Sequence, residues 1–252
     1  ACSPLSLLDA RPIAGVDGGA GAGALASALI IGKGVGFPDM PMGPANVPMV
    51  VLGAALLWFG WFGFNAGSSL AADGVATNAF VVTNTAAAAG MMSWLAMSWL
   101  IDKKPSAVGA ASGAVAGLVA ITPAAGFVGP MPALIIGLGA GVFCYSMVKL
   151  LMKLRVDDAL AVFGVHGIGG IWGALATGLF VGVGYAALGD GVSRAEQILN
   201  QLIAIGASFG WSFVVTGIIM LAIKYTIGLS ADEEGEGMGL DLSEHGEAAY
   251  EA

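Results

Sequence analysis

His166 is the residue best placed to do chemistry, because it is an ionisable side chain inside an uncharged run of 31 residues, 159–189. Such a group is costly at membrane depth, and it usually faces an internal cavity or a partner. A neutral imidazole can both accept and donate hydrogen bonds, so it can hold a small polar molecule on its way across a membrane. The alternative is a structural histidine that bonds a neighbouring backbone carbonyl.

A second candidate group lies about a hundred residues earlier in the chain. Trp61, Phe64, Asn65 and Ser68 recur at helical spacing, so they share one face of a helix. An aromatic face followed one turn later by a hydroxyl can hold a small cation through cation–π contact and a hydrogen bond. The competing interpretation is an aromatic belt at the membrane interface above a packed core.

Two acids precede the His166 run, and a threonine marks a break elsewhere. Asp157 and Asp158 lie directly before the run, at the expected start of a helix, where acids cap free backbone N–H groups and suit the helix dipole. Thr122 precedes Pro123 and indicates the end of a helix. The sequence has no Walker loop, no paired membrane carboxylates and no Cys/His metal spacing, so it predicts neither an enzyme nor a bound cofactor or metal.

The composition indicates the environment in which these residues lie. The chain of 252 residues is 57% hydrophobic and 10% charged, which is too little charge to cover a water-soluble surface. Its net charge of −8 comes from the tail 231–252, which holds eight acids and neither Lys nor Arg. The rest of the chain is neutral, so nothing favours nucleic-acid binding. We therefore expect a membrane domain over residues 1–230 and an acidic tail over 231–252.

Uncharged stretches locate the membrane spans. They are residues 18–32, 40–72, 74–101, 105–148, 159–189 and 197–223. A span needs about 20 apolar residues, so the stretch 105–148 is long enough for two, with the break between Thr122 and Pro132. The sequence thus predicts an all-α, polytopic bundle of about seven spans, the first being short and rich in Gly and Ala. Gly-x-x-x-Gly steps at 109–117, 137–141 and 169–173 predict close helix packing.

The basic residues orient the bundle. With seven spans, seven bases fall in loops on one side: Lys33, Lys103, Lys104, Lys149, Lys153, Arg155 and Lys224. Arg11 and Arg194 fall on the other side. The positive-inside rule then predicts an external N-terminus and a cytoplasmic C-terminal tail, with the protein in the cell membrane.

Four local strings resemble the Amt/MEP/Rh family of ammonium transporters, on its Amt branch. They are DDALAVFGVHGIGGIWGALATGLF at 157–180, WFGFNAGS at 61–68, SGAVAGLVAITP at 112–123 and GLDLSEHGE at 239–247. The first is similar to the family signature around its second pore histidine. The resemblance extends from about residue 25 to the end of the chain.

The resemblance implies a fold and an assembly. Family members are trimers of eleven-helix subunits built from two inverted halves, and this chain resembles the part from about the fifth helix onward. The resemblance further implies recruitment of ammonium at an outer vestibule, loss of a proton, and passage of ammonia through an apolar pore. It also implies a tail that takes part in regulation by PII-type proteins.

The resemblance also assigns residues to roles. His166 matches the second pore histidine, Phe64 a gating phenylalanine, Trp61 a pore-lining tryptophan and Ser68 the hydroxyl of the outer cation site. Asp158 matches an acid near the inner end with a structural role, and Thr122 a structural position near the pore. Counting back from Lys33 puts Asp17 where the family has its first pore histidine.

The chain departs from the family pattern in three places. Arg11, Pro12 and Ile13 do not match the motif that precedes the first pore histidine, and Ala161 replaces a second acid near the inner end. The family's first four helices, with the partner phenylalanine and the outer-site tryptophan, have no counterpart in these 252 residues. We therefore weigh ammonium transport against two alternatives: an ammonium sensor that signals through its tail, and a fragment that does not conduct by itself.

Overall fold

Helices account for the secondary structure of the part of the chain that the computed structural model describes, residues 10–39, 43–189 and 191–248. The elements are α1 (Ala10–Ile31), α2 (Val47–Gly67), α3 (Gly74–Asp102), α4 (Ala107–Ile121), the 3₁₀ turn η1 (Thr122–Ala124), α5 (Pro130–Lys153), the π turn η2 (Phe163–Gly167), α6 (Ile168–Phe180), α7 (Arg194–Thr226), α8 (Glu233–Met238) and α9 (Leu240–His245). The predicted all-α bundle is confirmed.

Six helical segments are long and apolar enough to cross a membrane. They are Val47–Gly67, Gly74–Asp102, Ala107–Ala124, Pro130–Lys153, Phe163–Phe180 and Arg194–Thr226. The long stretch 105–148 divides at η1, as the Thr122-Pro123 pair predicted. The weak first span corresponds to α1, whose apolar part, Val16–Ile31, is shorter than the others. The protein is therefore a multi-pass membrane protein.

Side-chain caps explain where several helices begin. Asn46, Asp73, Ser106 and Ser193 each accept a hydrogen bond from a backbone N–H in the first turn of α2, α3, α4 and α7. These bonds satisfy donors that have no partner inside the helix. At Asp73, which lies in the loop before α3, the N–H of Ala76 and the hydroxyl of Ser69 lower the pKa of the carboxyl.

Helices α3, α4 and α5 form what we call the central bundle, and glycines let their backbones touch. A Cβ on Gly90 would lie 2.5 Å from the carbonyl oxygen of Gly113, and a Cβ on Gly117 or Gly137 would collide with the carbonyl oxygen of Ala86. The predicted close packing at the Gly-x-x-x-Gly steps is thus confirmed.

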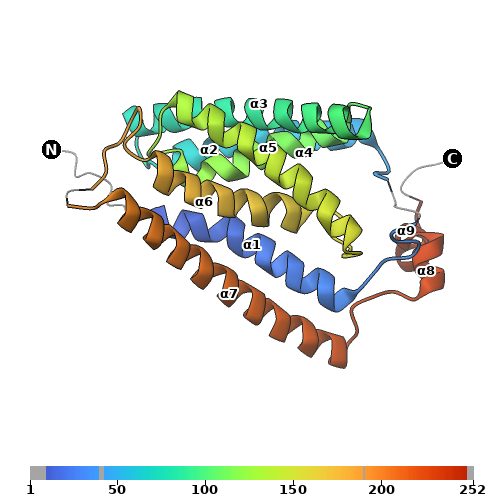
Figure 1. Ribbon diagram of the computed structural model, residues 1–252. Helices are drawn as coiled ribbons and strands as arrows, with labels where there is room; N and C mark the ends of the chain where they lie inside the picture. The colour runs from blue at the N-terminus through green and yellow to red at the C-terminus, as the bar shows by residue number, and fades with distance from the viewer. Residues whose placement is uncertain (1–9, 40–42, 190, 249–252) are drawn as a thin grey trace.

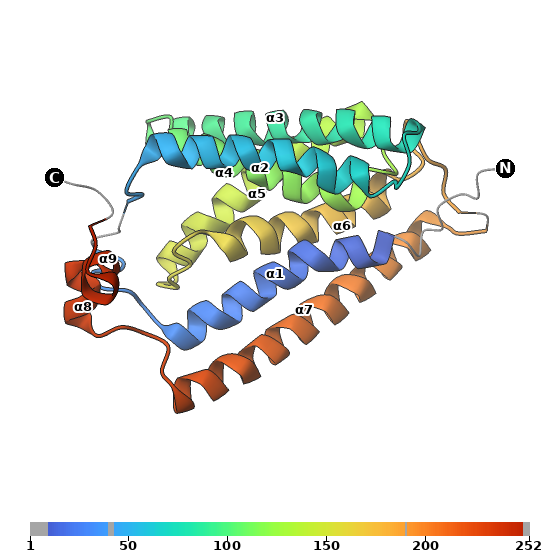
Figure 2. The same ribbon diagram turned by 180° about the vertical axis from the view of Figure 1, so that it is seen from behind.

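Helices α1 and α7 form what we call the lateral pair. They run side by side along one flank of the molecule, and α6 lies between them and the central bundle (Figures 1 and 2). Glycines of α1 face hydroxyls of α7: a Cβ on Gly19 would lie 2.8 Å from the Ser212 Oγ, and one on Gly23 would lie 3.0 Å from the Thr216 Oγ1. The pair therefore packs closely, through small residues.

The short tail helices α8 and α9 lie at the end of the bundle where α1 finishes (Figure 1). The Glu236 carboxylate accepts a hydrogen bond of 3.2 Å from the N–H of Val35 in the loop after α1. Lys224, near the end of α7, donates to the carbonyl oxygen of Ile30 at 2.8 Å. The tail is thus connected to the end of the lateral pair.

Candidate functional site

His166 lies in the π turn η2, at the start of the helix that continues as α6. The N–H of Ile168 reaches the carbonyl oxygen of Phe163, five residues back, in place of the usual four. Single π turns inside α-helices are rare, and they are frequent at functional sites. The residues around His166 in this turn are buried, whereas the imidazole keeps 27% of its surface exposed.

Glycines bring α1 against this turn. A Cβ on Gly21 would collide with the backbone of Gly167, and a Cβ on Gly170 would lie 2.6 Å from the amide nitrogen of Gly18. This backbone-to-backbone approach places Asp17 beside the imidazole: the Asp17 Oδ1 lies 3.1 Å from the His166 Nδ1. Asp17 is 5% exposed. The structure thus joins Asp17 and His166, which are 149 residues apart in the sequence.

The pair has specific hydrogen-bonding capacity. An ionised carboxylate can only accept, so in that state the bond requires the proton on Nδ1, and a neutral ring then presents Nε2 as an acceptor. The second oxygen of Asp17, Oδ2, is buried and has no hydrogen-bond partner in the described residues. A buried acceptor without a donor costs about 1–3 kcal/mol, which a small N–H donor would offset.

The second predicted group lies on α2 and is joined to the end of α4. The Trp61 Nε1 donates to the Thr122 Oγ1 at 2.8 Å, and this hydroxyl donates to the carbonyl oxygen of Leu118. Trp61 is partly buried against the central core, so its indole N–H bridges two helices. Asn65 makes a similar bridge, because its amide donates to the Thr83 hydroxyl of α3 at 2.9 Å.

Phe64 and Ser68 lie at the end of α2. The Phe64 ring meets Trp61 edge-on, with ring centroids 5.6 Å apart, and 45% of its surface is exposed. The Ser68 hydroxyl donates to the carbonyl oxygen of Phe64 at 2.6 Å, and its oxygen remains an available acceptor. The structure brings Trp61, Phe64, Ser68 and Thr122 together, and no hydrogen bond within the described ranges joins them to the Asp17–His166 pair.

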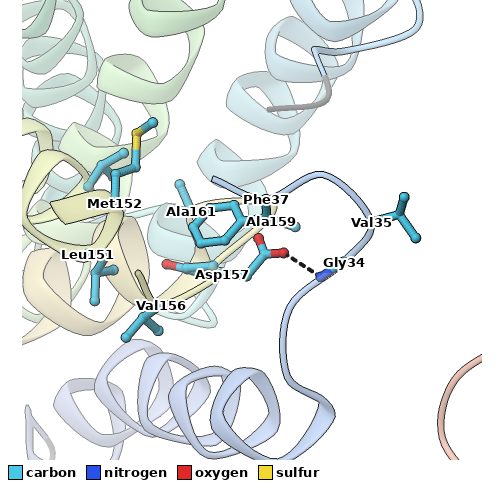
Figure 3. Close-up of a pocket in the computed structure, with 11 residues that line it drawn as sticks. Gly34, Val35, Phe37, Leu151, Met152, Val156, Asp157, Ala159 and Ala161 are labelled. Atoms are coloured by element: carbon cyan, nitrogen blue, oxygen red, sulfur yellow. Dashed lines mark hydrogen bonds between the residues drawn. The ribbon is translucent and has the colours of Figure 1, made fainter. Parts of the chain in front are cut away.

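Asp158 and Asp157 have different partners just before the start of the His166 helix. The Asp158 carboxylate accepts from the N–H groups of Val162, at 2.8 Å, and Gly164, at 3.0 Å. Asp157 instead accepts from the N–H of Gly34, at 2.9 Å, in the loop after α1. Figure 3 shows this contact at the edge of a cavity of about 290 Å³, whose other walls are mainly apolar.

Three features of this site were missed by sequence reasoning. The π turn has no simple signal, because the residue types of Phe163–Gly167 do not distinguish a π turn from an α-helix. Trp172 donates to the carbonyl oxygen of Ile136 on α5 at 2.9 Å, and Arg194 caps the far end of α6. No signal in the local sequence indicates that Arg194, at the start of α7, caps the end of the preceding helix. In the described ranges, no group of three His, Cys, Asp or Glu residues is arranged to hold a metal ion.

Fold and site together define a multi-pass helical membrane protein in which a buried carboxylate contacts a partly buried imidazole between the helices. The sequence profile of the Ammonium Transporter Family matches residues 11–250, and the chain belongs to this family. It is 48% identical to an ammonium transporter of Bacillus subtilis over 92% of this chain and 58% of the relative, and 46% identical to the ammonium transporter Amt1 of Archaeoglobus fulgidus over 91% and 59%.

Solved structures agree with this assignment. A structure described as "Sensor Amt Protein" superposes with a TM-score of 0.86 at 32% identity, covering 93% of this chain and 59% of that one. Mep2 of Saccharomyces cerevisiae superposes with a TM-score of 0.77 at 36% identity, covering 86% and 52%. The chain spans about half to three fifths of the length of the curated relatives it matches.

Proposed function

We propose that this chain forms the part of an ammonium transporter that carries its internal hydrogen-bonding site, and that the site is the Asp17–His166 pair. The observation that carries the proposal is the contact of 3.1 Å between two ionisable side chains of α1 and η2, with Asp17 buried. An ion at the centre of a bilayer is costly, so polar groups at this depth mark a substrate path.

The pair suits a small nitrogen compound with N–H groups. The Asp17 Oδ2 has no partner, and the Nε2 of a neutral His166 is an acceptor when Nδ1 bonds to Asp17. Two acceptors on adjacent groups can hold ammonia, or ammonium before its proton is lost. Small residues on α1 and α6 let the two backbones approach closely, which holds Asp17 and His166 beside each other.

The α2 group is proposed as the entry to this path. The exposed Phe64 ring can contact a cation through its face, and the Ser68 oxygen can accept from an N–H. Trp61 lines the path beside Phe64, and Thr122 fixes the Trp61 indole. Asp158 is structural, because both of its carboxylate oxygens cap backbone N–H groups.

The proposal includes the setting of the protein. Residues 1–230 are the membrane domain and 231–252 the acidic cytoplasmic tail, with the N-terminal side outside the cell membrane. Basic loop residues on one side and acids in the tail support this orientation. The family supports a homotrimer, and the contact of the tail with the loop after α1 supports a regulatory partner of PII type on that side.

The test is electrogenic or pH-detected ammonium uptake into proteoliposomes. We would compare empty liposomes, the 252-residue chain, and a fusion of the chain to the N-terminal part of the Archaeoglobus Amt1, which is 46% identical over the shared region. We expect the fusion to transport and the chain alone not to conduct. His166→Ala in the fusion should reduce transport about tenfold or more, as loss of one strong hydrogen bond predicts.

Each measurement tests one part of the proposal. Saturable conductance from the isolated chain would contradict the expectation that it needs further helices. Unchanged transport and selectivity in the His166→Ala fusion would remove His166 from the mechanism. Ammonium binding without flux in a well-folded fusion, with the parent Amt1 active alongside, would contradict transport and favour the sensor alternative.

A further inference from the structure

The helix that carries His166 meets neighbouring backbones closely at three of its glycines. A Cβ on Gly21 of α1 would collide with the backbone of Gly167, a Cβ on Gly170 would lie 2.6 Å from the amide nitrogen of Gly18, and a Cβ on Gly173 would collide with the Ala120 carbonyl. Glycines allow close approach, but they offer no side chain that interlocks with the next helix. Rotation of this part of the helix would bring larger side chains into the same backbones, so these contacts resist it, and the two ends of the helix are held by other residues.

The inner end of this helix is held by Asp158. Its two carboxylate oxygens take the N–H groups of Val162 and Gly164, on either side of the start of the π turn. Between Asp158 and the turn, Ala161 has a φ of +54°, in the left-handed region that a non-glycine residue seldom adopts. The Asp158 carboxylate thus stabilises the start of the helix directly after Ala161, whose backbone conformation is otherwise unfavourable.

The outer end is held by Arg194. Its Nη1 lies 3.1, 2.9 and 2.6 Å from the carbonyl oxygens of Gly178, Leu179 and Val181, where α6 ends. These carbonyls have no partner inside the helix. An acid at the N-terminal end and a base at the C-terminal end both complement the helix dipole. The His166 helix is therefore clamped at both ends by side chains of matching charge.

The position of His166 depends on the π turn between these clamps. A π turn contains one residue more than the α-helical ladder, and each residue corresponds to a rotation of about 100°. If the turn relaxed into a regular α-helix, residues on one side would rotate by about that angle relative to the other. The bond from Trp172 to the Ile136 carbonyl holds one point of the helix only, so a rotation on either side of the turn would displace His166 from Asp17.

We propose that Asp158 and Arg194 are positioning residues for His166: together they preserve the π turn and hold the imidazole against Asp17. Neither residue needs to touch the substrate. The inference rests on the proposed function only in taking the Asp17–His166 pair as the transport site; the positioning itself is a property of the resting protein, and it can be measured without transport.

The chain offers a direct probe, because it contains two histidines, His166 and His245. In a His245→Ala background labelled with ¹⁵N-histidine and held in lipid nanodiscs, the side-chain nitrogen signals come from His166 alone. Asp17→Ala provides the reference spectrum for a ring that has lost its partner. We expect Asp158→Ala to move the His166 signals most of the way toward that reference, or to split them into several conformers. Arg194→Leu should shift them in the same direction and by less, because the outer clamp is farther along the helix.

Matched controls separate positioning from a general effect of charge. Asp157→Asn removes the neighbouring acid, which bonds the loop after α1, and Glu196→Gln removes a charge two residues from Arg194. Both should leave the His166 signals at their wild-type positions. The conservative variants Asp158→Asn and Arg194→Lys retain part of each clamp, so they should give intermediate shifts and decide the matter if the harsher variants fail to fold.

Wild-type His166 signals in folded Asp158→Ala or Asp158→Asn protein would overturn the proposal for Asp158, and the same result in the two Arg194 variants would overturn it for Arg194. Failure of the proposed function looks different. In that case the fusion protein transports normally while His166→Ala has no effect, whatever the NMR spectra show.

Discussion

The central bundle and the lateral pair are built from similar residues but are held in different ways. In the central bundle, α3, α4 and α5 each contact the other two, and polar side chains cross-link α3 to its surroundings. Asn78 of α3, for instance, donates to the carbonyl oxygens of Ala125 and Val128. In the lateral pair, α7 has no residue buried beyond Gln197 and Gln201 among those described, and it rests mainly on α1.

This difference in packing indicates which part of the site can move. The Asp17–His166 pair lies at the seam between the lateral pair and the helix that rests on the central bundle. His166 lies on a helix that the central bundle supports, whereas Asp17 lies on α1, which has less support. Changes in the central bundle should therefore destroy the fold, whereas changes at the seam should separate the pair and leave most of the fold intact.

The largest effect is expected from Gly117→Ala in the central bundle. The added Cβ collides with the Ala86 carbonyl, and neither backbone can move without disturbing α5. We expect a loss of about 3 kcal/mol in the free energy of unfolding, the upper part of the range for overpacked cores. Thermal unfolding in detergent or nanodiscs measures it. An unchanged melting temperature would mean that α3 and α4 are not packed this closely.

A smaller loss is expected from Gly21→Ala at the seam, about 2 kcal/mol, because α1 can shift away from η2 together with α7. The His166 nitrogen signals should move toward those of Asp17→Ala while the central bundle stays folded. The matched control is Gly18→Ala, where a Cβ has no atom within 4 Å. Equal behaviour of the two variants would show that the seam is not a close backbone contact.

Asn78→Ala tests the cross-links of the central bundle. The change leaves the buried carbonyl groups of Ala125 and Val128 without their donor, which should cost about 1.5 kcal/mol. Asn84→Ala is the control, since Asn84 is an exposed residue on the same helix. Because alanine favours a helix more than asparagine does, Asn84→Ala should be neutral or slightly stabilising. A comparable loss in both variants would contradict the cross-link as the cause.

The smallest effect, a gain of about 0.5–1 kcal/mol, is expected from Gly60→Ala on α2. Alanine favours the helix over glycine by this amount, and a Cβ at position 60 meets nothing within 4 Å. A loss of stability in the assembled protein would instead show that another helix or a second copy of the chain packs closely on this face of α2.

Much of the fold could be predicted because the sequence signals are strong ones. Long uncharged runs located the spans, and Thr122-Pro123 marked the break that became η1. Charge patterns cannot define helix ends closely: the stretch 40–72 contains a helix that begins only at Val47, because Asn46 caps it, and ends at Gly67. The first span was the weakest prediction because Asp17 and many small residues dilute its hydropathy.

The site was predicted in part. His166 stood out as a single ionisable group in an apolar run, and Asp17 followed from the resemblance alone, since nothing in the local sequence links it to a residue 149 positions away. The contact depends on glycines that meet across α1 and η2, and pairings between helices cannot be read from spacing. The π turn and the Arg194 clamp depend on backbone geometry, which residue types do not encode in a simple way.

The length of α7 has a consequence for the surrounding lipid. Its uncharged part, residues 197–223, would span about 40 Å as a straight helix, against about 30 Å for the hydrocarbon core of a bilayer. The helix must therefore lie oblique to the membrane normal, in line with its slant relative to α3 in Figure 1, or sit in a locally thickened bilayer. Because α1 leans on α7, the thickness of the host membrane acts on the helix that carries Asp17.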